Sequence, residues 1–125
     1  MTVDLELEGT TDAAAAARRA LDRFADFVSE QRMRDVRLLV SELVTNAVRH
    51  AGLSPDDRIR LLAELAGGSL RIEVHDPGEG FEPRTPAPDP ARSSGWGLYL
   101  VAELADRWGV EQANPGTRIW FELQA

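Results

Sequence analysis

Apolar and acidic residues alternate over positions 3–8, and this spacing of two predicts a half-buried β-strand that ends at Gly9. An alanine-rich stretch follows. Thr11 or Asp12 can cap it as a helix, because either side-chain oxygen accepts hydrogen bonds from the free N–H groups of a first turn. The apolar stripe of this helix is predicted to comprise Leu21, Phe24, Phe27 and Val28.

A longer helical pattern runs from about Met33 to His50. Its core-facing residues recur every three or four positions: Val36, Leu39, Val40, Leu43, Val44 and Ala47. Gly52 is a suitable stop, because glycine readily adopts the left-handed backbone that commonly ends a helix. This segment is predicted to be the main helix of the fold.

Further along the chain, apolar residues recur at every second position, first at 59, 61, 63 and 65 and then at 70, 72 and 74. Gly67-Gly68 predicts a tight hairpin turn between these strands. A short helix over 98–105 and a hairpin formed by 108–112 and 117–123 complete the pattern. Helices and strands in this order predict an α+β fold. We expect a two-layer α/β sandwich whose mixed, mostly antiparallel sheet carries the helices on one face.

Residues 77–94 form the one long irregular stretch, and they include five prolines. A loop of this length inside a compact domain is often functional, so a mobile lid is expected over about residues 81–94. Neither an internal repeat nor a linker divides the sequence. Residues 1–125 are therefore expected to form a single domain.

The net charge and the missing residue types exclude several kinds of partner and reaction. Net charge is −7, from 14 basic and 21 acidic residues, which argues against direct partners such as nucleic acid or an anionic membrane. Cysteine is absent, which removes disulfides and thiolate metal sites. Lysine is also absent, which excludes a P-loop, the common protein-kinase fold and Schiff-base chemistry. There is no membrane-spanning apolar run and no signal peptide, so a cytoplasmic location is expected.

Glu42, Asn46, Arg49 and His50 fall on one stripe of the long helix. Asparagine is a poor helix former, which indicates that Asn46 serves another purpose. Its side-chain oxygen is a hard ligand suited to Mg²⁺, and Glu42 one turn away could accept a proton from an attacking hydroxyl. A solvated helix face is the alternative interpretation of this pair taken alone.

Asp76 follows an apolar strand and precedes Gly78 and Gly80. A carboxylate at this place can accept a hydrogen bond from an exocyclic amine such as adenine N6. The glycines let the backbone approach a flat base closely. An ordinary Asp-Pro-Gly turn is the alternative.

Gly95 and Gly97 open the short helix ahead of Leu98. Free N–H groups at the start of a helix favour an anion such as phosphate, although a glycine-rich loop end would explain these residues equally. Thr117, at the start of the last strand, could place its hydroxyl under a base.

Together these segments resemble the nucleotide-binding Bergerat fold, which gyrase-type ATPases, Hsp90 chaperones, sensor histidine kinases and mismatch-repair proteins share. Three motifs carry the resemblance: Glu42-x-x-x-Asn46 is similar to the N-box, Asp76-x-Gly78-x-Gly80 to the first glycine box, and Gly95-x-Gly97-Leu98 to the second. Residues 41–51 and 97–106 are most similar to the small anti-sigma factor serine/threonine kinases. The resemblance covers the chain from about residue 11 to its end.

The resemblance implies a role for each candidate residue. Asn46 would coordinate Mg²⁺ between the phosphates of ATP, Glu42 would activate a serine hydroxyl of a protein substrate, and Asp76 would recognise adenine. The remaining nucleotide-binding positions are Gly78, Gly80, Gly95, Gly97, Leu98 and Thr117. Because lysine is absent, Arg49 or Arg92 would assist Mg²⁺ and backbone N–H groups in neutralising the phosphates.

The implied function is that of an ATP- and Mg²⁺-binding anti-sigma regulatory factor with serine/threonine protein kinase activity towards an anti-sigma factor antagonist. Its partners would be a sigma factor and a STAS-like antagonist, and a homodimer is left open. One alternative is a non-catalytic ATP-binding module that sequesters its partner. The other is the detached catalytic domain of a histidine kinase. Against it, His50 and His75 both lie inside the nucleotide-binding region, and no upstream helix pair with a phosphoacceptor histidine is expected.

Overall fold

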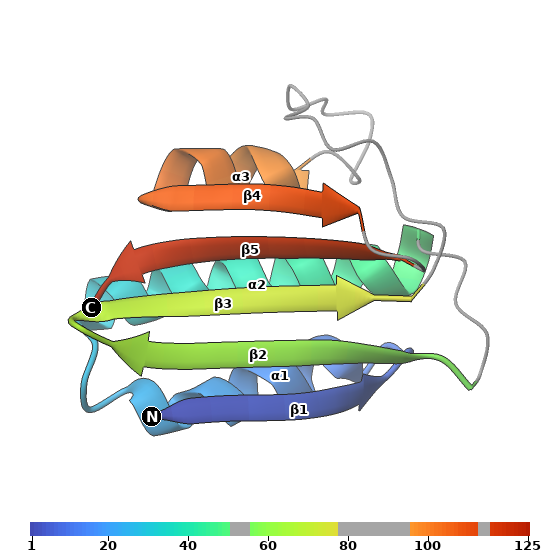
Figure 1. The fold of residues 1–125 in the computed structure, drawn as a ribbon. Coiled ribbons are helices and arrows are strands. Elements are labelled where there is room, and N and C mark those ends of the chain that lie inside the picture. The colour runs from blue at the N-terminus through green and yellow to red at the C-terminus, as the bar shows by residue number, and fades with distance from the viewer. Residues whose placement is uncertain (51–55, 78–95, 113–115) are drawn as a thin grey trace.

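The computed structural model describes residues 1–50, 56–77, 96–112 and 116–125 (Figure 1). Its strands are β1 (Thr2–Glu8), β2 (Arg58–Ala66), β3 (Ser69–Asp76), β4 (Arg107–Gln112) and β5 (Thr117–Gln124). Its helices are α1 (Ala13–Leu21), α2 (Glu30–His50) and α3 (Trp96–Leu104), with a 3₁₀ turn, Asp22–Phe24, after α1. This order of elements is the one that the sequence pattern predicts.

The five strands form one sheet in the order β1-β2-β3-β5-β4. All four neighbouring pairs are antiparallel, so the described sheet is more regular than the mixed, mostly antiparallel sheet expected. Figure 1 shows the three helices on one face of this sheet, with α2 behind β3 and β5 and α1 behind β1 and β2. The α+β two-layer sandwich is therefore confirmed.

The core lies between the sheet and the helices. On α2 the buried apolar residues are those predicted, together with Met33 at the N-terminal end. Phe24 and Phe121 are the bulkiest fully buried side chains. Burying each large apolar side chain contributes about 1.5–3 kcal/mol, so this layer holds α2 firmly against the sheet. No helix in the described ranges is both long and apolar enough to cross a membrane.

Local expectations differ from the structure at three points. Asp12 is the N-cap residue of α1, but its side chain accepts no capping hydrogen bond. α2 begins at Glu30 rather than at Met33, because Ser29 Oγ accepts a hydrogen bond from the N–H of Arg32 at 3.2 Å and caps an extra polar turn. Phe27 was expected in an apolar stripe but is 58% exposed. The reason is that α1 ends at Leu21, and the 3₁₀ turn that follows breaks the helical period.

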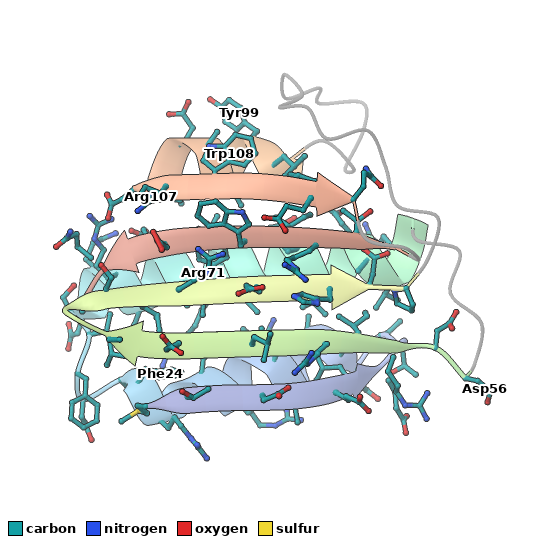
Figure 2. All side chains as sticks on the ribbon, in the orientation of Figure 1. Phe24, Asp56, Arg71, Tyr99, Arg107 and Trp108 are labelled. Carbon is teal, nitrogen blue, oxygen red and sulfur yellow. The ribbon has the colours of Figure 1, made fainter. Side chains whose placement is uncertain are left out.

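The helix-free face of the sheet carries paired charges. Arg60 of β2 donates two hydrogen bonds to Asp4 of β1, at 3.0 and 2.8 Å, and these bonds lower the pKa of the Asp4 carboxyl. Figure 2 shows Arg71 on β3, and its guanidinium carbon lies 4.2 Å from the ring centre of Trp120 on β5. This face is therefore held together by cross-strand pairs rather than by a second layer.

Glu73 is the centre of this charged face. Its carboxylate lies 3.2 Å from Arg71 Nε, 3.1 Å from His75 Nε2 and 3.6 Å from Arg118 Nε. Burial alone would raise the pKa of Glu73. The hydrogen bonds with His75 and Arg71 outweigh burial and hold that pKa below its ordinary value.

Candidate functional site

The candidate residues belong to segments that meet at one end of the sandwich. Figure 1 shows that α2 and β3 end, and that β5 begins, at this same end. α2 packs on both strands, and α3 packs on α2. The fold therefore brings together segments that are far apart in the sequence and that carry the predicted site.

Glu42 and Asn46 lie one turn apart on α2, and both are half-buried. Leu43 and Ala47 beside them are buried and face the core. Within the described part of the chain, neither Glu42 nor Asn46 forms a side-chain hydrogen bond or an ion pair. The two polar groups share one side of the helix and are available to a ligand.

Contacts from α1 and its 3₁₀ turn hold this part of α2 in place. Arg18 Nη1 donates to Ser41 Oγ at 2.8 Å, and Ser41 Oγ donates to the Arg37 carbonyl at 2.7 Å. Arg37 forms an ion pair with Asp22 at 3.0 Å. Because Ser41 adjoins Glu42, these contacts fix the rotation of α2 at the candidate base. No motif signals them, since only the fold brings α1 and α2 together.

Asp76 and Thr117 are register partners at the end of β3 and the start of β5. Asp76 is 6% exposed and Thr117 is fully buried. Thr117 Oγ1 has no hydrogen-bond partner among the described residues, although burying an unsatisfied hydroxyl is costly. A ligand group placed beside Asp76 would satisfy this hydroxyl.

Gly116 lets the backbones of β3 and β5 approach at this point. Its φ is +98°, and a Cβ there would lie 1.8 Å from the Asp76 carbonyl oxygen and 2.9 Å from Pro77 Cα. Any side chain would push Asp76 away from Thr117. In the sequence, Gly116 stands between the last two predicted strands and directly before Thr117, and this position is the one signal available for its role.

The glycine boxes are described in part. Gly97 lies in the first turn of α3, and Leu98 is 5% exposed against the core. Several predicted features lie outside the described residues: the helix stop Gly52, the box glycines Gly78, Gly80 and Gly95, and the lid over 81–94 together with Arg92. The structure thus places Asp76 of the first box and two residues of the second.

A metal ion at this site would need ligands from a nucleotide and water in addition to those of the protein. No group of three or more potential metal-binding side chains occurs in the described ranges. On the candidate stripe of α2 the side-chain oxygens are those of Glu42 and Asn46. Mg²⁺ usually binds through one or two protein oxygens together with phosphates and water, so this donor set fits a metal ion that arrives with a nucleotide.

Comparison with known proteins places the chain in a family. Residues 7–123 match the family model of the histidine kinase-like ATPase domain. The chain therefore belongs to the histidine kinase-like ATPase domain family, and an ATPase domain implies that it binds ATP. Its pair of register partners, Asp76 and Thr117, lies within the matched residues.

Individual relatives indicate the subfamily within this ATPase domain family. The chain is similar to the anti-sigma F factor of Clostridium botulinum, with 34% identity over 117 residues, covering 86% of this chain and 78% of the relative. The anti-sigma F factor of Clostridium acetobutylicum is 32% identical over 108 residues, 76% of either chain. The serine-protein kinase RsbW of Staphylococcus aureus is 31% identical over 98 residues, 68% of this chain and 61% of that one. These similarities confirm the anti-sigma kinase subfamily.

Proposed function

We propose that this protein is an ATP- and Mg²⁺-binding anti-sigma regulator that phosphorylates a serine or threonine of an anti-sigma factor antagonist. One observation carries the proposal: the buried pair Asp76 and Thr117, with its unsatisfied hydroxyl, lies at the end of the sandwich where α2, the helix that carries Glu42 and Asn46, ends. The similarity to anti-sigma F factors and to a serine-protein kinase supports the same assignment.

The β3–β5 end recognises the base. The Asp76 carboxylate accepts a hydrogen bond from adenine N6, and Thr117 Oγ1 gains the partner that it otherwise lacks. Gly116 keeps these two groups adjacent. Gly78, Gly80, Gly95, Gly97 and Leu98 complete the nucleotide-binding set.

The C-terminal half of α2 provides the chemistry. Asn46 supplies an amide oxygen to Mg²⁺, which neutralises phosphate charge when bound. The Glu42 carboxylate takes the proton of the acceptor hydroxyl while the hydroxyl oxygen bonds to the γ-phosphorus and ADP leaves with the bridging oxygen. A positioned base of this kind contributes about 10²- to 10⁴-fold to the rate.

The names of the relatives, an anti-sigma F factor and a serine-protein kinase, support the choice of partners. A protein of this subfamily would bind a sigma factor and a STAS-like antagonist in the cytoplasm, and phosphorylation would release it from the antagonist. A homodimer is compatible with this role. Sedimentation of the full chain, with and without ATP, measures that assembly directly.

Calorimetry tests the nucleotide half of the proposal. Wild type should bind ATP only when Mg²⁺ is present, and Asn46→Ala should lose most of the affinity. Gln31→Ala, an amide at the other end of the same helix, is the matched control and should bind like wild type. Equal affinity in Asn46→Ala would make Asn46 a helix-face residue only.

Phosphate transfer tests the kinase half. Labelled phosphate should move from ATP to the purified, unphosphorylated antagonist on a serine or threonine. Tight binding of the antagonist without any transfer would contradict the kinase and favour a non-catalytic module that sequesters its partner.

A further inference from the structure

One large apolar side chain is exposed on the main helix. In the described part of the chain, the exposed large apolar residues are Met1, Phe27 and Leu38. The first two lie at the N-terminus and in the turn before α2. Leu38 lies within α2, where it is 42% exposed although its neighbour Leu39 is fully buried. An exposed leucine in the middle of a long helix presents apolar surface in a fixed position.

Leu38 lies on the same side of α2 as the candidate base. It precedes Glu42 by one turn, and Arg34 precedes Leu38 by one turn, so the three side chains form a stripe. α1 packs on one flank of α2 and α3 on the other (Figure 1), while the buried residues of α2 face the sheet. The stripe points away from these neighbours, as the exposure of Arg34 and Leu38 shows.

Arg34 forms no ion pair with any of the described residues. Its Nη2 donates to Gln31 Oε1 at 2.9 Å, and this partner is neutral. The neighbouring Arg32 and Arg37 instead form ion pairs with aspartates. In a chain of net charge −7, Arg34 is therefore a local positive charge beside an apolar side chain.

We propose that Arg34 and Leu38 form a docking strip for the phosphoacceptor protein, which presents its hydroxyl to Glu42. This inference rests on the proposed kinase function. The strip selects a partner that carries an apolar side chain and a carboxylate near its acceptor residue. Leu38 and Arg34 are specificity-determining residues, because they contact the partner away from the reacting atoms.

Helix geometry sets the spacing of that partner surface. A rise of about 1.5 Å per residue places Leu38 about 6 Å and Arg34 about 12 Å from Glu42 along the helix axis. The partner should therefore carry its apolar side chain about 6 Å from the acceptor hydroxyl and its carboxylate about 12 Å from it, on one side. Leucine burial and charge complementarity would then act together.

Steady-state phosphate transfer tests the strip, with the purified, unphosphorylated antagonist as the varied substrate. Leu38→Ser should raise the KM for the antagonist about 10- to 100-fold while kcat and the KM for ATP stay unchanged. Leu38→Met should restore most of the affinity. Arg34→Glu should raise the same KM about tenfold at low salt and by less at about 0.5 M salt, because salt screens the pair.

Two controls match these substitutions. Phe27→Ser removes an exposed apolar side chain off the strip. Arg107→Glu reverses a charge on the helix-free face, where Figure 2 shows Arg107 on β4. Both should leave the KM for the antagonist unchanged. An unchanged KM in Leu38→Ser and Arg34→Glu, while wild type transfers phosphate, would overturn the strip but leave the kinase standing.

If the protein is not a kinase, the docking strip is tested by binding instead of by phosphate transfer. If wild type transfers no phosphate, the dissociation constant for the antagonist is measured by calorimetry for the same variants. Weaker binding in Leu38→Ser and Arg34→Glu would support the strip as the docking surface of a non-catalytic module. Unchanged binding, or a change only in the oligomeric state of the chain, would overturn it.

Discussion

Asp76 of β3 and Thr117 of β5 face each other across two antiparallel strands, and both residues are buried. Asp76 has an interaction partner in the structure, whereas Thr117 Oγ1 has none among the described residues. Folding thus leaves one buried hydroxyl unsatisfied at the place where the base is expected. A buried carboxylate beside an unsatisfied buried hydroxyl favours a ligand site over a stabilising interaction within the fold.

Thr117→Val should separate ligand binding from folding. Valine keeps the shape but removes the unsatisfied hydroxyl, so stability without nucleotide should stay equal or rise by about 1 kcal/mol. Affinity for ATP should fall about fivefold or more, as one hydrogen bond is lost. Urea unfolding and calorimetry measure the two quantities, with the exposed Thr2→Val as control. A large loss of stability with unchanged ATP affinity would assign the hydroxyl to the fold.

Asp76→Asn should weaken ATP binding more than it weakens the fold. The carboxylate accepts from adenine N6, whereas asparagine must turn its oxygen to do so. Losing one buried charge-assisted hydrogen bond costs about 1.5–3 kcal/mol, which is about 10- to 150-fold in affinity. Asp26→Asn in the exposed turn before α2 is the control. Equal affinity of wild type for ATP and GTP would show that Asp76 does not recognise adenine.

Gly116→Ala should be far more disruptive than Gly68→Ala. Both glycines have positive φ, +98° and +77°, so both variants carry the strain of a left-handed alanine, about 1–2 kcal/mol. A Cβ at Gly68 meets nothing within 4 Å, whereas one at Gly116 would lie 1.8 Å from the Asp76 carbonyl oxygen. Urea unfolding should show a loss larger by about 1–3 kcal/mol for Gly116→Ala. Equal losses would mean that the strand ends can separate freely.

Glu73 should make the folding stability of the protein depend on pH. Its pKa in the folded protein is below the ordinary 4.5, since hydrogen bonds with His75 and Arg71 outweigh burial. Its contribution is therefore fully present above pH 4.5 and is lost as pH falls through the lower folded pKa. Glu73→Gln should destabilise the protein by about 1 kcal/mol at neutral pH and by less in acid. Urea unfolding measured from neutral pH to below pH 4.5 gives the stability of both proteins, with the exposed Glu103→Gln as control. A loss of stability that does not change with pH would exclude the ionic contribution of Glu73.

The fold was largely predictable because each element has its own period. The alternation over residues 59–65 and 70–76 and the helical repeat of α2 each bury one face, so the core followed directly from the pattern. Phe27 was placed wrongly because a 3₁₀ turn interrupts the repeat after Leu21, and hydrophobicity alone does not reveal such a change.

The candidate site was predictable as a set of motifs but not as a structure. Glu42 and Asn46 share a helix face by spacing alone. The pairing of Asp76 with Thr117 and the contact of Arg18 with Ser41 depend on strand order and helix packing, which the sequence pattern leaves open. The exposure of Leu38 likewise depends on which flanks α1 and α3 cover.

The proposed kinase function depends most on Glu42 as its general base. Glutamine at this position keeps the shape and the hydrogen-bonding capacity but cannot take a proton. The decisive measurement is transfer of labelled phosphate from ATP to the unphosphorylated antagonist by wild type, Glu42→Gln and the control Glu103→Gln. We expect Glu42→Gln to bind ATP and antagonist like wild type but to transfer phosphate about 10²- to 10⁴-fold more slowly, while Glu103→Gln matches wild type. Transfer at the wild-type rate by Glu42→Gln would contradict the role of Glu42 as the base.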